Sequence, residues 1–529
     1  MTHTTHDAPE IDMQRAAPGL AHIPPRWGAI AGLVAGGLAV SVGMVVAGII
    51  EVVSPIDAVG SAFIDRVPPW LKELAIQWFG TNDKAALRVG IFAVLMVASL
   101  VVGALSVRRP IVGVVAFAAF GFVGAWAAAS RPGEPASAWL PSLIGAAVGA
   151  VVLLRIVRAP RAGGPIETPG PSRVPLGWDR RRFLITTGGA AAVATAAAGI
   201  AQMLERRRVD QIEQAIPDAL PSVEPLPAIP ADATVDPTIS YVTPNADFYR
   251  IDTALSFPRI DINRWKLDIG GMVETPVSFT YADLLARPQV ERIVTLTCVS
   301  NEVGGKYIGN AVWQGVMLKD LLDEAGVQPG AEQVFSTSID GWTCGFPVDL
   351  ALDGRDAMVA VGMNGEALPL AHGFPARLVV PGLYGYVSAT KWLRSIELTT
   401  WDAAEGYWVP RGWSREGPIK TQSRIDVPRR GAAVVAGPVR IAGVAWAQHR
   451  GIERVEVRID DGEWQEATLA ALVTDDSWRP WLLDWTATPG SHQVQVRATD
   501  KTGATQTEDV APPAPDGATG YHTRRIDVS

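Results

Sequence analysis

The sequence predicts a multi-domain protein: an N-terminal bundle of transmembrane helices, a central α+β domain and a C-terminal β-sandwich. Three observations predict this organisation. Long apolar runs without charges gather before about residue 205, strand and helix patterns alternate between 238 and 405, and strand patterns alone follow from about 420. A chain of 529 residues is long enough to form several domains.

Four apolar runs are long enough to cross a membrane as α-helices, since about 20 helical residues span roughly 30 Å of hydrocarbon. They are residues 28–50, 89–107, 111–130 and 138–154. No charged residue lies inside any of them. A fifth, weaker run of Ala, Gly and Thr extends from Phe183 to Leu204. We therefore expect five spans within residues 28–205, preceded by a disordered cytoplasmic tail, residues 1–27.

Arginines predict the orientation of these spans. Arg108 and Arg109 lie between the second and third runs, and an arginine-rich segment from Arg155 to Arg182 lies between the fourth and fifth. The positive-inside rule places both segments in the cytoplasm. Five spans then leave the chain after about residue 205 on the extracytoplasmic side, although Arg206 to Arg208 fall where this rule disfavours arginine.

The start of the fifth run resembles a twin-arginine export signal. Arg180-Arg-Arg-Phe-Leu184 precedes a weakly hydrophobic Ala-rich stretch, and such signals carry folded proteins across bacterial membranes. An alternative is that these arginines only set topology, as arginines beside many spans do. No convincing cleavage site follows. We expect an uncleaved internal signal, and hence a multi-pass protein of the bacterial cell membrane with an extracytoplasmic domain.

Beyond the spans, composition separates a linker from two folded domains. Residues 206–237 are rich in proline, which favours extended polyproline II, so we expect a linker there. Residues 238–405 mix short strands with helical periodicity, for example at 316–325, and form the α+β domain. In 420–529, Val455, Val457 and Ile459 alternate with charged residues before the turn Asp461-Gly462, which predicts an immunoglobulin-like β-sandwich without its usual cysteine pair.

Cys298, in the stretch Val294-Thr-Leu-Thr-Cys-Val-Ser-Asn301, is one of only two cysteines in the chain. A thiolate is a strong ligand for a soft metal centre. Two cysteines outside the cytoplasm can also form a disulfide, and a free cysteine can simply fill a core. Cys344 has no metal-binding motif around it, and we interpret it as a buried free thiol.

Residues 243–249, 294–301 and 371–393 resemble the molybdenum-binding core of the sulfite oxidase family, and the segment from Gly443 onward resembles its C-terminal dimerisation domain. The resemblance covers about residues 235–529 and leaves the predicted spans outside it. It implies a molybdenum–molybdopterin cofactor whose metal takes the Cys298 sulfur, and two-electron oxygen-atom transfer catalysed there. It also implies a homodimer formed through the sandwich.

The resemblance also implies which side chains hold the cofactor. They are Asn245, Phe248, Tyr249, Cys298, Asn301, His372, Arg377, Gly385, Ser388 and Lys391. A cofactor phosphate needs fixed positive charge, and Arg377 and Lys391 are the candidates for supplying it. Taken alone, Arg377 and Lys391 are equally well explained as solvated surface residues, and His372 as a structural histidine.

Three departures from the family pattern concern the substrate. Where sulfite-oxidising members carry Arg-Asn-His, Arg-Arg and a tyrosine, this chain has Ile251-Asp252-Thr253, Glu302-Val303 and Val361. A small divalent anion in a dry pocket needs paired cations. We therefore expect a neutral sulfoxide or N-oxide, with a sulfite dehydrogenase activity as the alternative. Arg250 partly compensates for the lost arginine, and Glu302 either repels anions or is merely exposed.

The electrons need a separate partner. None of the seven histidines lies inside a predicted span, and the chain has no haem-attachment, flavin or iron–sulfur motif, so we expect none of these cofactors here. A cytochrome or a quinol-linked membrane protein is the expected partner, beside membrane lipid and a small-molecule substrate; no nucleic acid is expected. Two alternatives of other classes are a cell-surface binding protein and a transporter, although the spans lack a transporter's intramembrane charges.

Overall fold

The computed structural model describes residues 23–158, 180–224 and 226–529, apart from positions 69–70, 72–73, 75–77 and 80–82. The chain divides into two compact units. The first comprises Met1–Arg66 and Ala75–Glu205, and the second comprises Val67–Leu74 and Arg206–Ser529. Most of the expected tail and most of the arginine-rich segment before the fifth run lie outside the described residues.

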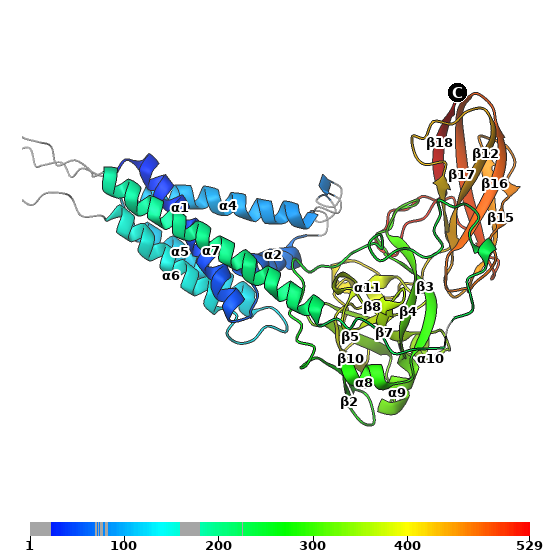
Figure 1. Ribbon diagram of the computed structural model, residues 1–529, viewed down its shortest axis with the longest axis horizontal. Coiled ribbons are helices and arrows are strands. Elements are labelled where there is room, and N and C mark those ends of the chain that lie inside the picture. The colour runs from blue at the N-terminus through cyan, green and yellow to red at the C-terminus, as the bar shows by residue number, and fades with distance from the viewer. Residues whose placement is uncertain are drawn as a thin grey trace, which may run out of the picture. The chain divides into compact units, whose positions relative to one another are not determined.

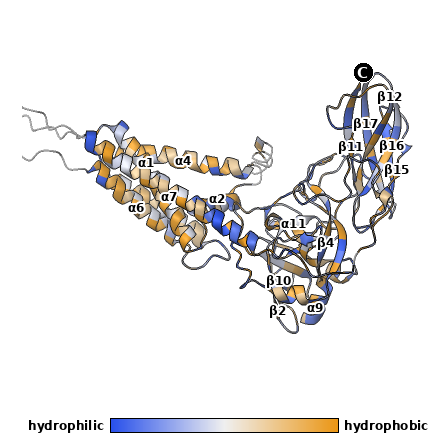
Figure 2. Cartoon of the chain, in the orientation of Figure 1, coloured by the Kyte–Doolittle hydropathy of each residue, from blue (hydrophilic) through white to orange (hydrophobic). Residues whose placement is uncertain are grey.

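The first unit is helical. Its helices are α1 (Pro25–Ile49), α2 (Pro55–Arg66), α4 (Asp83–Ser106), α5 (Pro110–Ala129), α6 (Leu140–Val157) and α7 (Arg180–Gln214), the last of which continues into the second unit. All of these except the short α2 are long and apolar enough to cross a membrane, and they overlap the five predicted runs. Figure 2 shows their predominantly hydrophobic colouring. The helix α2 has no counterpart among the predicted elements.

Small residues let α1 approach its neighbours closely. A Cβ atom added at Gly32 would lie 2.1 Å from the Ser99 carbonyl oxygen on α4, and one at Gly145 on α6 would lie 2.3 Å from the Ala39 carbonyl oxygen. These helices therefore pack with their backbones in contact. Such packing by glycine is typical of helices in membranes, where helix association has little hydrophobic driving force.

The α+β domain contains two five-stranded sheets (Figure 1). The first has the order β2 (Val277–Thr280), β1 (Lys266–Gly271), β10 (Leu393–Thr399), β5 (Gln333–Ser338) and β6 (Thr343–Pro347). The second has the order β3 (Val290–Thr297), β4 (Ile308–Met317), β7 (Met358–Met363) and β8 (Glu366–Ala367), with β9 (Arg377–Val379) also pairing with β7. The described helical segments from residue 231 to residue 411 are η2 (Ala231–Ala233), α8 (Tyr281–Ala286), α9 (Leu318–Ala325), α10 (Asp349–Leu352), η3 (Leu370–His372), α11 (Gly385–Ser388) and η4 (Val409–Arg411).

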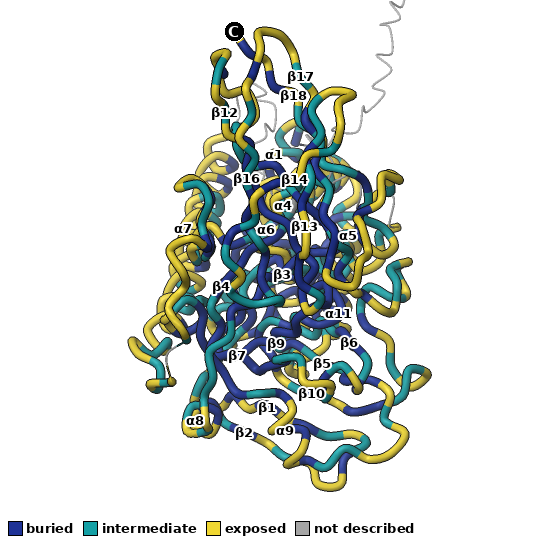
Figure 3. The backbone as a smooth tube through the Cα atoms, turned by 90° about the vertical axis from the view of Figure 1, so that its right-hand side faces the viewer, coloured by how far each residue is buried: buried dark blue, intermediate teal, exposed yellow. Residues whose placement is uncertain are grey.

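The core of this domain is centred on the second sheet. Every residue of β7 is buried, and most of β3 and β4 is buried as well (Figure 3). Trp313 on β4 is fully buried, and its indole N–H donates to the Val294 carbonyl of β3 at 3.0 Å. Because both faces of the strands are covered, the register of β3 against β4 is firmly set.

The expected linker is packed against the α+β domain. Helix α7 extends to Gln214, and Arg208 donates to the carbonyls of Phe257 and Pro258 at 3.2 and 3.1 Å. Leu220 packs on the domain core, and the carbonyl of Pro221 accepts a hydrogen bond from Gln314. The structure thus differs from the expected extended linker, because its scattered apolar residues find partners that proline content alone does not reveal.

The C-terminal domain is the predicted immunoglobulin-like sandwich. One sheet has the order β11 (Gln422–Val427), β12 (Gly437–Trp446), β16 (Arg479–Ala487) and β15 (Thr468–Leu469). The other has the order β14 (Gln465–Glu466), β13 (Ile452–Ile459), β17 (Gly490–Asp500) and β18 (His522–Val528). The alternating residues Val455 and Val457 point into the core between the sheets with Val494, Val496 and Trp481, as the period-two pattern predicts.

A buried carboxylate at the end of β17 secures the sandwich. Asp500 accepts hydrogen bonds from the Thr421 hydroxyl at 2.7 Å, from Arg450 at 2.9 Å and from the backbone and hydroxyl of Thr502. Burial opposes the ionised form, but the bonds from Thr502, Thr421, Arg450 and Ala504 outweigh it and lower the pKa of Asp500 to about 2.

We expect Asp500 to make the stability of this domain depend on acid pH. Its folded pKa is depressed, so its contribution to stability is present above the ordinary aspartate pKa of 3.8 and is lost as pH falls towards about 2. Asp500→Asn should lower the free energy of unfolding by about 1–3 kcal/mol near neutral pH. It should also make this free energy depend less on pH in the acid range. Thermal unfolding of the detergent-solubilised chain across this pH window measures both effects. The exposed Asp461→Asn serves as control, and parallel profiles for the wild type and Asp500→Asn would contradict the prediction.

Candidate functional site

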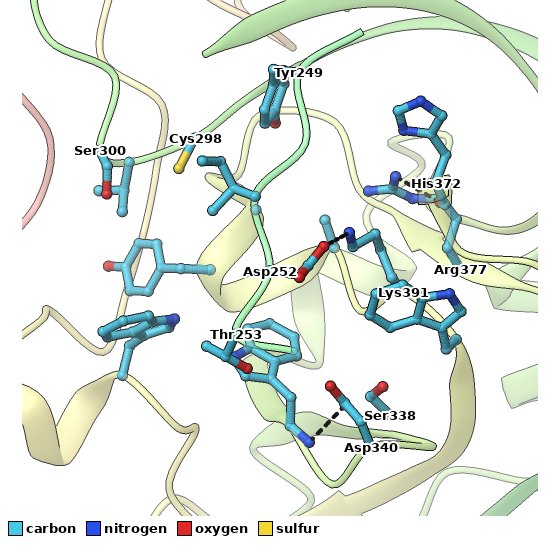
Figure 4. A pocket seen from close by; sticks show the side chains of 18 of the residues that line it. Tyr249, Asp252, Thr253, Cys298, Ser300, Ser338, Asp340, His372, Arg377 and Lys391 are labelled. Carbon is cyan, nitrogen blue, oxygen red and sulfur yellow. Dashed lines mark hydrogen bonds and ion pairs between the residues drawn. The ribbon is translucent and has the colours of Figure 1, made fainter. Parts of the chain in front are cut away.

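A cavity in the α+β domain collects residues from five segments of the chain. Its walls come from residues 248–253, 298–300, 338–342, 372–392 and 408–413, and the space between them, counted out to solvent, is about 940 Å³. Seven of the implied cofactor-binding residues line it, namely Phe248, Tyr249, Cys298, His372, Arg377, Gly385 and Lys391. Figure 4 shows that the labelled members of this set face a common space.

Cys298 enters the cavity directly after the last residue of β3. The thiol is buried, and its backbone N–H donates to the Tyr307 carbonyl at 2.9 Å. Burial raises the pKa of the Cys298 thiol, although the Ser300 backbone N–H and hydroxyl oppose this by hydrogen bonding to the sulfur. Those two donors are positioned to stabilise a thiolate. Cys344 is likewise a free, buried thiol, as predicted, but it contacts Ser336 and Thr390 and is absent from the cavity lining.

Arg377, the first residue of β9, is a buried cation without an acidic partner among the described residues. Its Nη1 donates to the His372 carbonyl at 3.1 Å, and its guanidinium lies 4.9 Å from the centre of the Trp313 ring. Burial lowers the pKa of Arg377 to about 10, with Tyr249 opposing, so the group stays protonated. A buried charge without a counter-ion is costly. The site is therefore prepared for an anionic group.

His372 is neutral at physiological pH. Burial lowers its pKa to about 4, a hydrogen bond with Asn245 opposes this, and the nearby cations Arg377, Lys391 and Arg250 add to the lowering. Its Nε2 lies 2.9 Å from the Asn245 carbonyl oxygen, which can only accept, so the ring proton resides on Nε2. The ring also packs edge-on against Phe248. His372 fixes the wall of the cavity, and its Nδ1 remains an acceptor.

Lys391 is already paired with a carboxylate. Asp252, whose side chain is only 5% exposed, accepts from Lys391 Nζ at 2.7 Å and from Arg250 Nε at 2.9 Å. Burial lowers the pKa of Lys391 to about 8, while Asp252 opposes this by charge and hydrogen bonding. Figure 4 places the Asp252 carboxylate near the middle of the cavity. A single internal carboxylate is thus shared by two cations, Lys391 and Arg250.

Three implied cofactor residues lie outside the cavity lining. The side chain of Asn245 bonds Asn364, Met363 and Glu366. Asn301 Oδ1 accepts from the Tyr307 N–H at 2.7 Å, while its buried Nδ2 has no partner in the part of the chain that the structure describes. Ser388 is fully buried and donates to the Tyr384 carbonyl. In this structure Asn245 and Ser388 hold loops in place, and only Asn301 keeps an unused donor.

The cavity also contains residues that the motif patterns did not single out. Ser338, at the end of β5, lines it with a buried hydroxyl that has no hydrogen-bond partner among the described residues. Asp340 accepts from the Trp342 backbone N–H and has no cationic partner among the described residues. Trp408 and Trp413 complete an aromatic wall with Tyr386, the Tyr386 and Trp413 rings being 5.7 Å apart. These residues lie far apart in the sequence, and no motif in the sequence pointed to them.

Glu302 is exposed and does not line the cavity, so it has no direct effect on an anion there. Val361 is buried within β7. Of the three sequence departures, the only one that places a charge in the cavity is Asp252.

Residues 254–408 match the family described as oxidoreductase molybdopterin binding domain, and residues 422–496 match the bacterial Ig domain. The uncharacterized oxidoreductase YuiH of Bacillus subtilis is 36% identical over 157 residues, which cover 30% of this chain and 76% of that protein. The chain belongs to the sulfite oxidase family of molybdopterin-dependent oxidoreductases.

The match to human sulfite oxidase extends beyond the α+β domain. Human mitochondrial sulfite oxidase is 30% identical over 324 residues, covering 52% of this chain, and the chain spans 59% of that enzyme's length. The sulfane dehydrogenase SoxCD from Paracoccus pantotrophus has a solved structure that is 26% identical, with a TM-score of 0.48 over 60% of this chain and 90% of that one.

The residues present fit the family's cofactor. Among the described residues no group of three or more His, Cys, Asp or Glu side chains could hold a metal ion unaided. A metal bound at Cys298 must therefore bring most of its ligands with it, as a molybdenum held by a dithiolene does. Arg377, which has no acidic partner among the described residues, would hold a phosphate, and Ser338, whose hydroxyl is unbonded within the same described part of the chain, would offer a donor.

We expect Arg377 to be needed for cofactor retention. Arg377→Met removes the unpaired cation, and loss of charge-assisted hydrogen bonds worth about 1.5–3 kcal/mol should lower pterin and molybdenum retention roughly 10- to 100-fold. Quantification of released pterin by fluorescence and of molybdenum by mass spectrometry measures this. Arg377→Lys should retain part of the cofactor, and Arg394→Met, at an exposed position on β10, should retain all of it. Full cofactor content in Arg377→Met would show that Arg377 is not a phosphate-binding residue.

Proposed function

We propose that this chain is a membrane-anchored, extracytoplasmic molybdenum oxidoreductase that transfers an oxygen atom to or from a small neutral substrate. A sulfoxide or an N-oxide is favoured over sulfite. The observation that carries this proposal is the Asp252 carboxylate, which lies between Arg250 and Lys391 inside the cavity. In the reducing direction the S–O or N–O bond breaks, two electrons and two protons are taken up, and water leaves.

The charges of the cavity support a neutral substrate. Its lining carries two cations, Arg377 and Lys391, and two carboxylates, Asp252 and Asp340. Lys391 is committed to Asp252, and Arg377 is proposed to bind the cofactor phosphate. No unpaired cation of the lining then remains for sulfite, whose burial would need cationic partners.

The aromatic wall supports the same substrate class. Trp342, Tyr386, Trp408 and Trp413 present apolar ring faces in the cavity lining. The methyl or alkyl groups beside a sulfoxide or N-oxide oxygen can pack on these faces, and a partly positive sulfur or nitrogen is attracted to an aromatic ring. Sulfite offers no apolar group for such contacts.

The chain's own residues have separate roles in holding the cofactor. Cys298 is proposed to bind the metal through its sulfur, with Ser300 donating to that sulfur, and Arg377 is proposed to hold the phosphate. Neutral His372 is held in the cavity wall by its bond to the Asn245 carbonyl. When bound, the molybdenum centre supplies two-electron redox chemistry; Tyr249 and Phe248 shield that region from water by stacking on each other.

The membrane unit provides anchoring in this proposal. Five helices are long and apolar enough to span, and the arginines before the fifth favour export of the domains that follow it. The electron partner is proposed to be a separate cytochrome or quinol-linked membrane protein, since no histidine lies in the apolar runs to provide bis-histidine haem ligation. We also propose that the chain forms a homodimer through the sandwich, because the family resemblance implies it.

Sulfite oxidation is the second candidate. Its support is the similarity to sulfite oxidases together with three cations, Arg250, Arg377 and Lys391, in or beside the cavity. A substrate screen separates the two candidates. The reduced, detergent-solubilised enzyme is mixed with sulfoxides and N-oxides, the oxidised enzyme with sulfite, and the optical change of the cofactor is followed in both. Faster turnover with sulfite would overturn the favoured substrate class, and absence of molybdenum from the wild type would overturn the proposed enzyme itself.

We expect Asp252→Asn to strengthen anion binding. The substitution keeps the side-chain shape but releases Lys391 and Arg250 from their carboxylate, so sulfite should bind about tenfold more tightly, equivalent to about 1.4 kcal/mol. The gain should shrink as pH rises, because Lys391, whose pKa is already lowered to about 8, deprotonates. The inhibition constant of sulfite against sulfoxide reduction reports the effect.

Asp340→Asn is the matched control for this change. It removes one negative charge from the same cavity without releasing a paired cation, because Asp340 bonds only a backbone N–H. It should change sulfite inhibition by less than Asp252→Asn does. Equal effects of the two variants would show that overall charge, and not the Asp252 pairing, excludes the anion.

A further inference from the structure

The strand that leads to Cys298 is covered by the immunoglobulin-like domain. β3 is an edge strand of its sheet, with β4 on one side only. On its open side, the Thr295 N–H donates to the Asp476 carbonyl at 2.9 Å, and the Thr295 hydroxyl accepts from the Trp478 N–H at 2.8 Å. An open strand edge normally requires such protection. Here it comes from loops of the neighbouring domain.

Gln448 makes the contact closest to Cys298 on this side. Its side chain is fully buried, and its Nε2 donates to the Thr295 carbonyl at 3.0 Å and to the Thr297 hydroxyl at 3.1 Å. One amide group thus holds two of the three residues that precede Cys298. A buried amide that makes two such bonds fixes the direction in which the strand ends.

The loop after Cys298 is held by the same domain at a second point. Arg424 on β11 donates from Nη1 to the Gly305 carbonyl at 2.9 Å, while Asp426 orients its guanidinium. The ring of His522 on β18 lies against Gly304, where an added Cβ would be 2.3 Å from the ring. Gly304 has a φ of 73°, so glycine is favoured there on conformational grounds as well.

Cys298 therefore lies between two attachments to the immunoglobulin-like domain. Within the loop itself, the Cys298 N–H bonds Tyr307 and the Cys298 carbonyl accepts from the Asn301 N–H. These bonds tie the loop to itself and to the first residues before β4. Besides these bonds and the pairing of β3 with β4, the loop is held against the immunoglobulin-like domain by Gln448 before Cys298 and by Arg424 after it.

We propose that the C-terminal immunoglobulin-like domain positions the Cys298 sulfur in the cavity, with Gln448 and Arg424 as the positioning residues. The inference deepens the proposed function, because it rests on that function for its effect on turnover. The placement of the thiol can nevertheless be measured without the metal. The domain then serves the active site directly, besides any role in dimerisation.

Alkylation of the full chain, produced in cells deprived of molybdate, tests the proposal. The chain contains only two cysteines, so peptide mass spectrometry separates the iodoacetamide reaction of Cys298 from that of Cys344. Gln448→Leu and Arg424→Met should each accelerate alkylation of Cys298 about tenfold, because a released loop exposes the thiol more often. Alkylation of Cys344 should not change.

Three further variants and one further measurement define the outcomes. Arg424→Lys retains a donor for Gly305 and should react at nearly the wild-type rate. Arg458→Met removes an arginine from the opposite sheet of the sandwich, where it bonds Gln495, and should have no effect. Gln448→Glu removes the donor and should behave like Gln448→Leu. In cofactor-loaded protein, Gln448→Leu and Arg424→Met should also retain less molybdenum.

Unchanged alkylation in both Gln448→Leu and Arg424→Met would overturn the proposal. So would a parallel acceleration at Cys344, because that result indicates general loosening of the fold. A wild-type protein without molybdenum would count against the proposed function alone, since the alkylation rates do not depend on the metal.

Discussion

The register between β3 and β4 is the constraint on which the site depends. The strands pair without interruption from Val290 opposite Gly315 to Thr297 opposite Ile308, so β3 ends one residue before Cys298. A slip of one residue would turn the side chains of β3 to opposite faces and would bury different groups in the core. The buried indole of Trp313, bonded to β3 and stacked under Arg377, links this register to the charged wall of the cavity.

The cavity lining contains two cations, Arg377 and Lys391, whose surroundings differ. Arg377 stacks on an aromatic ring and bonds a carbonyl, arrangements that orient a guanidinium without cancelling its charge. Lys391 forms an ion pair with the carboxylate of Asp252, so its positive charge is compensated within the protein. Replacing Asp252 by a neutral group would leave both Lys391 and Arg377 without a carboxylate partner among the described residues. Asp252 alone therefore has a large influence on the proposed substrate class.

Sequence patterns predicted the helices and strands better than they predicted the contacts between distant segments. The apolar runs, the alternation of Val455, Val457 and Ile459, and the motif around Cys298 depend on local spacing, and all three correspond to structure. The cavity places of Ser338 and Trp413, and the pairing of Lys391 with Asp252, depend on contacts between segments far apart in the chain. Likewise, the resemblance implied Asn245 as a pterin contact, whereas here its side chain bonds the turn at Asn364. No local pattern distinguishes these cases.

The arginines after the fifth apolar run illustrate how such distant contacts matter. Arg208 lies where the charge rule disfavours arginine, yet it bonds the carbonyls of Phe257 and Pro258. Phe257 packs under the guanidinium of Arg250 and against Trp392, the residue after Lys391. The residues that follow the last apolar run therefore support the segment that carries Asp252 and its two cationic partners. These contacts give a structural reason for arginine at position 208.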